Sequence, residues 1–180
     1  MNITSVECLV LDEEYPYVVL HTDEGFTGFG ECFRRAPYVS KAVVETVFDP
    51  LVVGKSPFDS EEIWDSMFKA GAVAGPLGAL LTAAAGVDLA LWDLKGKILG
   101  SPIYNLIGGK RRESIKVYAS SLVRDMAPRD EAKRVAHFRD KGFSAYKMHS
   151  AVPGKIDDPG DQTIETVKAI RDEVGYEMDV

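Results

Sequence analysis

The sequence predicts an α+β domain followed by the first alternating strands and helices of a parallel sheet or βα barrel. Three observations support this fold class. Three β-rich runs open the chain, with turn signals between them. Helical patterns then fill the middle, and after Arg112 strand-like and helical segments alternate, which is the order typical of βα units. We therefore expect one domain over residues 1–112 and a second over residues 113–180.

The β-rich runs predict a three-stranded antiparallel meander. Residues 3–11 and 17–22 form the first two strands, and the acidic segment 12–16 links them. A turn that contains glycine, a residue that readily adopts positive φ, leads into a third strand over 26–31. The GFG triplet at 28–30 lacks the third glycine and the helix of a dinucleotide-binding loop, so that function is excluded here.

Three sequence patterns predict the main helices of the first domain. The first helix covers 39–47 and is expected to end at Asp49-Pro50, because a residue before proline avoids the helical conformation. The second begins near residue 59, with Asp59 or Ser60 as its cap. The third and longest covers 77–99. Its expected buried face comprises Leu80, Ala84, Val87, Leu91, Leu94 and Ile98.

The second domain is predicted to begin a series of parallel βα units. The expected strands cover 115–120 and 145–149 and begin again at 177, and the expected helices cover 129–141 and 161–174. This alternation is the order of parallel sheets and barrels. The third strand reaches Val180, so we expect an open sheet edge there.

Two ionisable side chains lie at the end of the second of these strands. Because alternate strand residues face opposite sides, Lys147 and His149 share one face, about 6.5–7 Å apart along the strand. Tyr146 and Met148 share the other face. If helices cover that other face, Lys147 and His149 point inward at the strand's carboxyl end, where a βα barrel keeps its chemistry. The alternative is that both side chains only hydrogen-bond to loops.

Composition excludes several classes of function. The net charge of −7 argues against nucleic acid as a partner, because a phosphate-binding surface needs clustered lysine and arginine. No apolar stretch is long enough to span a membrane, and no signal peptide is evident at Met1. Cys8 and Cys32 are interpreted as reduced core thiols of a cytoplasmic protein rather than as a disulfide or metal pair.

Three stretches of the chain resemble one protein family. The run AAAGVDLALWDLKGK at 83–97, continued by the glycine pair at 108–109, resembles the mandelate racemase / muconate lactonising branch of the enolase superfamily. So do GFTGFGE at 25–31 and GFSAYKMH at 142–149. The resemblance implies an α+β capping domain, made of the three-stranded antiparallel meander plus helices. It further implies that the first βα units of a TIM-like (β/α) barrel follow, in truncated form.

The resemblance also implies a reaction. Family members use Mg²⁺ to abstract the proton α to a carboxylate and form a metal-stabilised enolate, as acid-sugar dehydratases (lyases) or hydroxy-acid racemases (isomerases). They frequently carry Lys-x-Lys on the second barrel strand, and the match here is Lys147-Met148-His149. Lys147 is therefore expected to stabilise the substrate carboxylate. His149 takes the position of the base and is expected to act as base, as acid or only to orient the substrate.

The resemblance assigns further roles with fewer residues to support them. Arg34, just after the third strand, is a candidate for binding a small carboxylate substrate, with a solvated loop as the alternative. The Mg²⁺ ligands are expected beyond Val180, and no residue of the chain is assigned to the metal. The acidic residues at 157, 158 and 161 lack the spacing of a calcium loop. A homo-oligomer is expected.

From these absences we expect the 180 residues alone to be inactive and the complete protein to be about twice as long. Two other classes of protein stay open. One is a binding or assembly module without catalysis. The other is a different βα enzyme in which Lys147 forms a Schiff base with a carbonyl substrate.

Overall fold

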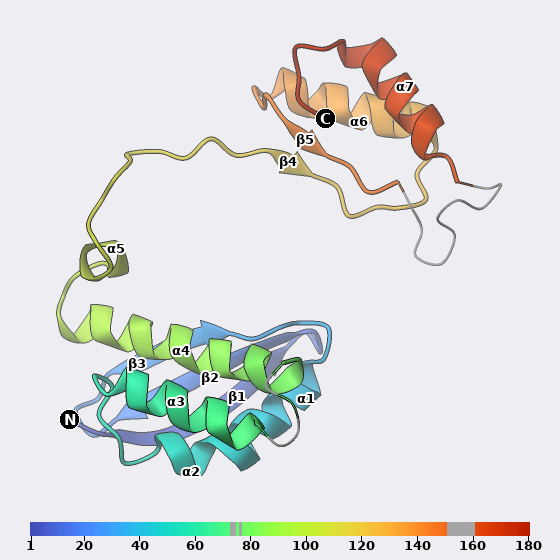
Figure 1. The fold of residues 1–180 in the computed structure, drawn as a ribbon. Helices are drawn as coiled ribbons and strands as arrows, with labels where there is room; N and C mark the ends of the chain where they lie inside the picture. Colours follow the sequence, from blue (N-terminus) through green and yellow to red (C-terminus); the bar gives the residue numbers. More distant parts are fainter. Residues whose placement is uncertain (73–74, 76, 151–160) are drawn as a thin grey trace. The chain divides into compact units, whose positions relative to one another are not determined.

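The computed structural model describes residues 1–72, 75, 77–150 and 161–180, and the chain divides into unit 1, Met1–Arg111, and unit 2, Arg112–Val180. Unit 1 is a three-stranded antiparallel sheet in the order β1-β2-β3, with helices packed on it (Figure 1). The expected meander is therefore confirmed. Its elements are β1 (Ile3–Leu11), β2 (Tyr15–Thr22), β3 (Thr27–Glu31), α1 (Pro37–Val43), the π-helical turn η1 (Val44–Phe48), α2 (Asp49–Val52), α3 (Ser60–Gly71), α4 (Ala79–Ile98) and α5 (Ile103–Leu106).

The connection between β1 and β2 is tighter than the acidic linker expected over 12–16. Asp12 and Glu13 have φ values of 49° and 58°, and the N–H of Glu14 donates to the carbonyl of Leu11 at 3.0 Å. Positive φ at both central residues is the geometry of a type I′ hairpin turn, which matches the twist of the flanking strands. β2 consequently begins at Tyr15, two residues earlier than predicted.

The prediction that a helix ends at Asp49-Pro50 is wrong. Helical structure runs on from α1 through η1 into α2. Pro50 occupies the first turn of α2, where a missing N–H costs no intrahelical hydrogen bond. The preceding π turn changes the register of the backbone hydrogen bonds, and this irregularity accommodates the proline.

Helix α4 approaches β3 so closely that side chains are excluded at the contact. A Cβ atom added at Gly30 would lie 2.0 Å from the carbonyl oxygen of Gly86, and one added at Gly28 would lie 2.3 Å from that of Ala90. The two glycines of the GFG triplet at 28–30 therefore serve helix–sheet packing, in agreement with the exclusion of a dinucleotide loop. Around this contact the described core of unit 1 includes Val18, Leu20, Phe48 and Leu91.

Side chains of α4 also form hydrogen bonds with backbone groups of the edge strand β3. Oδ2 of Asp93 accepts the N–H of Phe29 at 2.9 Å and pairs with Lys97 at 2.5 Å. Nζ of Lys97 donates in turn to the carbonyl of Thr27 at 2.8 Å. An edge strand presents backbone groups that attract other strands, and these two contacts engage such groups on β3.

The described residues of unit 2 form two short parallel strands and two helices, namely β4 (Ala119–Ser120), α6 (Pro128–Asp140), β5 (Tyr146–Lys147) and α7 (Thr163–Val174). An isolated parallel bridge joins Ala145 to Asp179, so a third strand begins where it was expected. α6 and α7 pack on each other (Figure 1). The strands are shorter than the predicted 115–120 and 145–149, because ladder hydrogen bonds form only where neighbouring strands lie alongside.

Three further observations complete the fold. Cys8 and Cys32 are free and buried, as expected. Within the part of the chain that the structure describes, no helix is both long and apolar enough to cross a bilayer. Two of the acidic residues examined as a calcium loop, Asp157 and Asp158, lie outside the described residues.

Candidate active site

Lys147 lies at the carboxyl end of β5, on the side of the strand opposite the helices. Its neighbour Tyr146 is only 3% exposed and packs among residues of α6 and α7. The Lys147 side chain is exposed, as alternation along a strand requires. Among the residues of unit 2 that the structure describes, none forms a layer over the face of β4 and β5 that carries Lys147.

His149 lies two residues beyond β5 and is half-buried. Its Nδ1 is 2.5 Å from the backbone carbonyl oxygen of Ser121, at the end of β4. A carbonyl oxygen only accepts, so Nδ1 carries the hydrogen in this contact. The ring also lines a small cavity together with Glu131 of α6 and Thr166 of α7. Because β5 ends at Lys147, strand alternation does not fix the direction of His149, and the hydrogen bond to Ser121 does so instead.

Ser121 connects the two candidate residues. Its N–H donates to the carbonyl of Lys147 at 3.0 Å, and its carbonyl accepts the His149 ring. In a continued parallel ladder that carbonyl would accept the backbone N–H of His149. Here the imidazole reaches the same oxygen, which explains why regular pairing ends at Lys147. Ser121 itself is 1% exposed.

A buried tyrosine–glutamate pair lies behind this strand end. The hydroxyl of Tyr146 donates to Oε1 of Glu131 at 2.8 Å, and Glu131 is 3% exposed. Burial, together with the hydrogen bond to Glu131, raises the pKa of Tyr146 to about 12. The neighbouring Ser121 side chain acts on this pKa in the opposite direction. Tyr146 therefore stays neutral and donates its hydroxyl hydrogen at physiological pH.

The sequence analysis missed Ser121 and Glu131 as members of this cluster. A usable signal was present for Glu131, because the buried residues of α6 include Glu131, Ala132, Val135 and Ala136. Their spacing is that of the stripe a helix turns toward its core, and a carboxylate on that stripe needs a partner. For Ser121 no comparable signal exists, since its role depends on its backbone.

The third predicted site residue, Arg34, belongs to unit 1. It lies after β3 and donates to Oε1 of Glu14 at 2.7 Å, with 31% of the arginine side chain exposed. Glu14 follows the β1–β2 turn. The ion pair thus joins the β1–β2 turn to the segment that follows β3.

The described residues offer no Mg²⁺ site of their own. Among residues 1–72, 75, 77–150 and 161–180, no group of three or more histidine, cysteine, aspartate or glutamate side chains is placed to hold a metal ion. Asp179, the carboxylate on the third strand, is exposed and takes part in the bridge to Ala145 through its backbone. The described residues therefore supply no complete set of ligands for the metal that the resemblance implies.

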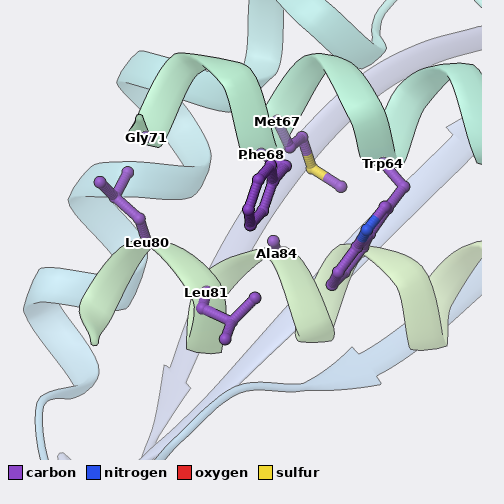
Figure 2. A pocket seen from close by; sticks show the side chains of 7 residues that line it. All are labelled: Trp64, Met67, Phe68, Gly71, Leu80, Leu81 and Ala84. Carbon is purple, nitrogen blue, oxygen red and sulfur yellow. The ribbon is translucent and has the colours of Figure 1, made fainter. Parts of the chain in front are cut away.

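A second depression lies in unit 1, between α3 and α4 (Figure 2). Its lining is almost wholly apolar and consists of Trp64, Met67, Phe68, Gly71, Leu80, Leu81 and Ala84. Apart from the indole of Trp64, these side chains carry no hydrogen-bonding or charged group that would orient a polar substrate. We interpret the depression as incomplete packing between two helices.

Known proteins resemble the chain along its whole length. A family model described as the N-terminal domain of mandelate racemase / muconate lactonizing enzyme matches residues 4–108. A D-galactarolactone cycloisomerase from Agrobacterium fabrum (strain C58 / ATCC 33970) is 35% identical over 164 residues, which cover 89% of this chain and 41% of that protein.

Solved structures show the same likeness in three dimensions. A mandelate racemase/muconate lactonizing protein from Paracoccus denitrificans PD1222, complexed with magnesium, is 29% identical with a TM-score of 0.86, covering 97% of this chain and 49% of that chain. A protein from Mesorhizobium loti is also 29% identical with a TM-score of 0.86, and the likeness covers 99% of this chain and 51% of that chain. The chain thus spans about two fifths to one half of these relatives. The likeness extends over both units, which confirms a capping domain followed by the first βα units of a barrel.

Proposed function

Because the chain belongs to the mandelate racemase / muconate lactonizing enzyme family, we propose that it takes part in abstracting the proton α to a substrate carboxylate. The step produces an enolate, from which an acid-sugar dehydratase loses water and a hydroxy-acid racemase returns the proton to the other face. The proposed substrate is a small carboxylate of one of these classes. The relative named for galactarolactone favours the acid sugars. The chain spans about half of its solved relatives, so the activity is proposed for the whole protein.

The observation that carries the proposal is the hydrogen bond between His149 and Ser121. Holding hydrogen on Nδ1 leaves Nε2 as the ring nitrogen with a lone pair whenever the imidazole is neutral. A base needs such a nitrogen within reach of the proton that it removes. We propose that Nε2 accepts the α-proton, or that the imidazolium, protonated at Nε2, donates that proton to the leaving hydroxyl.

Lys147 has a complementary role in this proposal. Removing the α-proton places a second negative charge on a substrate that already carries a carboxylate. An ammonium group fixed on a strand stabilises that charge without having to reorganise during the reaction. The exposed Lys147 at the carboxyl end of β5 is suited to this task.

Magnesium dependence is proposed from the family, in which a Paracoccus denitrificans relative is a magnesium complex. No described residue of this chain is assigned as its ligand, and no step above runs through the metal. Arg34 is proposed to bind the distal end of the substrate. To do so it must share its guanidinium with Glu14 or release that carboxylate.

Solvent-deuterium exchange tests the proposed function. The whole protein with Mg²⁺ in D₂O is expected to wash out the α-proton of at least one acid sugar or 2-hydroxy acid. Lys147→Met should slow exchange by about 10²- to 10³-fold, the range of a lost charge-stabilising group. His149→Gln should slow it by about 10²- to 10⁴-fold, the range of a lost general acid–base group. Lys168→Met, on the exposed surface of α7, is the matched control and should leave exchange unchanged.

Three results would contradict the proposal. Exchange that is unaffected by Lys147→Met or His149→Gln would refute the roles assigned to these residues. Exchange that survives complete chelation of divalent metal would refute the proposed magnesium-dependent reaction. Irreversible trapping of a carbonyl substrate on Lys147 by borohydride would favour a Schiff-base enzyme instead.

A further inference from the structure

We propose that two helix side-chain pairs keep the edges of the unit 1 sheet closed to strand addition by a second copy of the chain. The pairs are Lys41–Glu45, on α1 and η1, and Asp93–Lys97, on α4. Because the sheet has the order β1-β2-β3, β1 and β3 are its two edges. An edge strand offers unpaired backbone N–H and C=O groups to any strand that comes alongside. This role is independent of the proposed reaction.

The Lys41–Glu45 pair engages both backbone groups of one residue on β1. Oε1 of Glu45 accepts the N–H of Cys8 at 3.1 Å, and Nζ of Lys41 donates to the carbonyl of Cys8 at 2.7 Å. In an antiparallel ladder each residue directs its N–H and C=O to the same side, alternately toward its neighbour and away from it. Cys8 lies opposite Val18 of β2 and gives both groups to the helices, so these groups belong to the outer side of β1. The carboxylate and the ammonium therefore take the places of the C=O and N–H of a residue in an added antiparallel strand.

The start of β1 is closed in a similar way by backbone. The N–H of Ile3 donates to the carbonyl of Lys55, and the N–H of Gly54 donates to the carbonyl of Ile3, each at 2.9 Å. Ile3 and Cys8 are an odd number of residues apart, and both face outward because the ladder shifts register between Ile3 and Ser5. With the loop at Ile3, the Lys41–Glu45 pair closes the middle of the strand.

The Asp93–Lys97 pair engages two residues on β3. Oδ2 of Asp93 accepts the N–H of Phe29 at 2.9 Å, and Nζ of Lys97 donates to the carbonyl of Thr27 at 2.8 Å. A residue of a parallel strand bonds in this manner, because its N–H and C=O reach two residues that lie two apart on the neighbouring strand. The pair on β3 thus occupies the positions that an added parallel strand needs, and the pair on β1 occupies those of an added antiparallel strand.

The two edges differ in how readily an added strand would bind them once open. β1 has nine residues without proline or glycine and carries a single charge, at Glu7. Leu9 and Leu11 on this strand are 44% and 50% exposed. Segments of this composition favour β pairing between molecules. β3 has only five residues, two of which are glycines. The Lys41–Glu45 pair is therefore the more important of the two.

The strand excluded at this edge is β1 of a second copy. Two identical strands related by a two-fold axis pair antiparallel, which is the ladder that the backbone groups of Cys8 suit. The side chains of Lys41 and Glu45 are 38% and 33% exposed, and an ion pair with this much contact with water adds little to folding stability. The main effect of the pair is therefore expected on association between copies.

Sedimentation velocity of the whole protein tests the proposal. The double variant Lys41→Ala/Glu45→Ala keeps the net charge and frees both backbone groups of Cys8. It should form species larger than the wild-type one at about tenfold lower protein concentration, the equivalent of one hydrogen bond that an incoming strand no longer has to displace. Asp65→Ala/Lys69→Ala is the matched control. It removes a pair of the same spacing on α3 and should sediment like the wild type.

Amide hydrogen exchange at Cys8 locates the association. In the wild type this N–H should exchange slowly at every protein concentration, because Glu45 accepts it. In Lys41→Ala/Glu45→Ala it should exchange faster in dilute solution and slow down as larger species form. Glu45→Gln keeps an oxygen for the Cys8 N–H and should behave like the wild type. If the double variant does not fold, Glu45→Ala replaces it and should lower the concentration for association by about threefold.

A folded Lys41→Ala/Glu45→Ala protein, or Glu45→Ala in its place, that sediments like the control up to its solubility limit would overturn the proposal. So would larger species in which the Cys8 amide still exchanges fast, because association would then use another surface. Asp93→Ala/Lys97→Ala should associate less readily than the variant at Lys41 and Glu45. The reverse order would contradict the greater importance assigned to the β1 edge.

Discussion

The two units of the chain bury their strands in different ways. In unit 1 α4 lies against the sheet so closely that Gly30 has no room for a side chain, and Asp93 hydrogen-bonds the edge strand. In unit 2 helices cover one face of a short sheet. Apolar residues near its strands stay exposed, with Ile115 at 73% and Leu122 at 62%.

The two units also differ in how their polar side chains are used. Unit 1 engages its described polar groups in packing, as in the Asp93–Lys97 pair. Unit 2 presents Lys147 on an exposed side of β5, and the backbone carbonyl of the buried Ser121 hydrogen-bonds the His149 ring. The family fold is consistent with such a division, because barrels place reactive side chains at the carboxyl ends of strands and support them from the other end or the outer layer.

The largest expected effect on stability tests the close packing of α4 against β3 in unit 1. Gly30→Ala places a methyl group against the backbone oxygen of Gly86, so α4 must move, and we expect a loss of about 3 kcal/mol. Both tryptophans, Trp64 and Trp92, lie in unit 1, so urea unfolding followed by their fluorescence reports this unit.

Gly71→Ala is the matched control for that substitution. Its added Cβ would lie 3.3 Å from a side-chain atom of Leu80, and alanine is the better helix former, so stability should change by less than about 1 kcal/mol. Equal, small effects of Gly30→Ala and Gly71→Ala would refute the described contact between α4 and β3.

A smaller effect is expected at the covered edge of the sheet. Asp93→Ala removes the acceptor for the Phe29 N–H and the partner of Lys97, which should cost about 1–2 kcal/mol. Asp65→Ala makes the same chemical change in an exposed pair with Lys69 and should stay within about 0.5 kcal/mol. The comparison fails if the two variants unfold at the same urea concentration.

Alkaline pH distinguishes unit 2. Because burial and the bond to Glu131 raise the pKa of Tyr146 to about 12, the folded state disfavours its ionised form. The associated stability is intact below the ordinary tyrosine pKa of about 10 and is lost as the pH rises toward about 12. Amide hydrogen exchange in unit 2 should show this loss in the wild type. Tyr146→Phe should not show it, and identical pH profiles would contradict the assignment.

The smallest expected effect is a gain in stability at the β1–β2 turn. Glu13 has a φ of 58°, a conformation that costs a side-chain-bearing residue energy and that glycine adopts readily. Glu13→Gly should stabilise unit 1 by about 0.5 kcal/mol in thermal unfolding. Glu14→Gly, one residue on, loses the ion pair with Arg34 and should not stabilise. A loss in Glu13→Gly would argue against the type I′ geometry.

Much of unit 1 could be predicted because its signals are local. The apolar stripe that includes Leu80, Val87, Leu91 and Leu94 predicts α4 to within two residues at its start. The turn at Asp12-Glu13 could not be predicted, since glutamate rarely adopts positive φ and the glycine that normally follows asparagine or aspartate in such a turn is missing. The helix end predicted at Pro50 was wrong for a similar reason, because whether a helix can continue past this proline depends on the π turn before it.

The candidate site was only partly predictable. Lys147 and His149 stand out by type and spacing at a strand end. The partner of His149, however, is a backbone carbonyl of Ser121, and backbone acceptors leave no trace in side-chain identity. Strand lengths in unit 2 were overestimated because β propensity does not reveal how far neighbouring strands run alongside.

The most direct test of the account asks whether His149 stands where the family keeps its base. His149→Lys and His149→Gln should be compared with the wild type for α-proton exchange in D₂O, using the whole protein and the substrate that the exchange screen identifies. The account predicts that the lysine variant, which creates the Lys-x-Lys pattern, retains measurable exchange while the glutamine variant loses it. Equal exchange by the glutamine variant and the wild type would contradict the account.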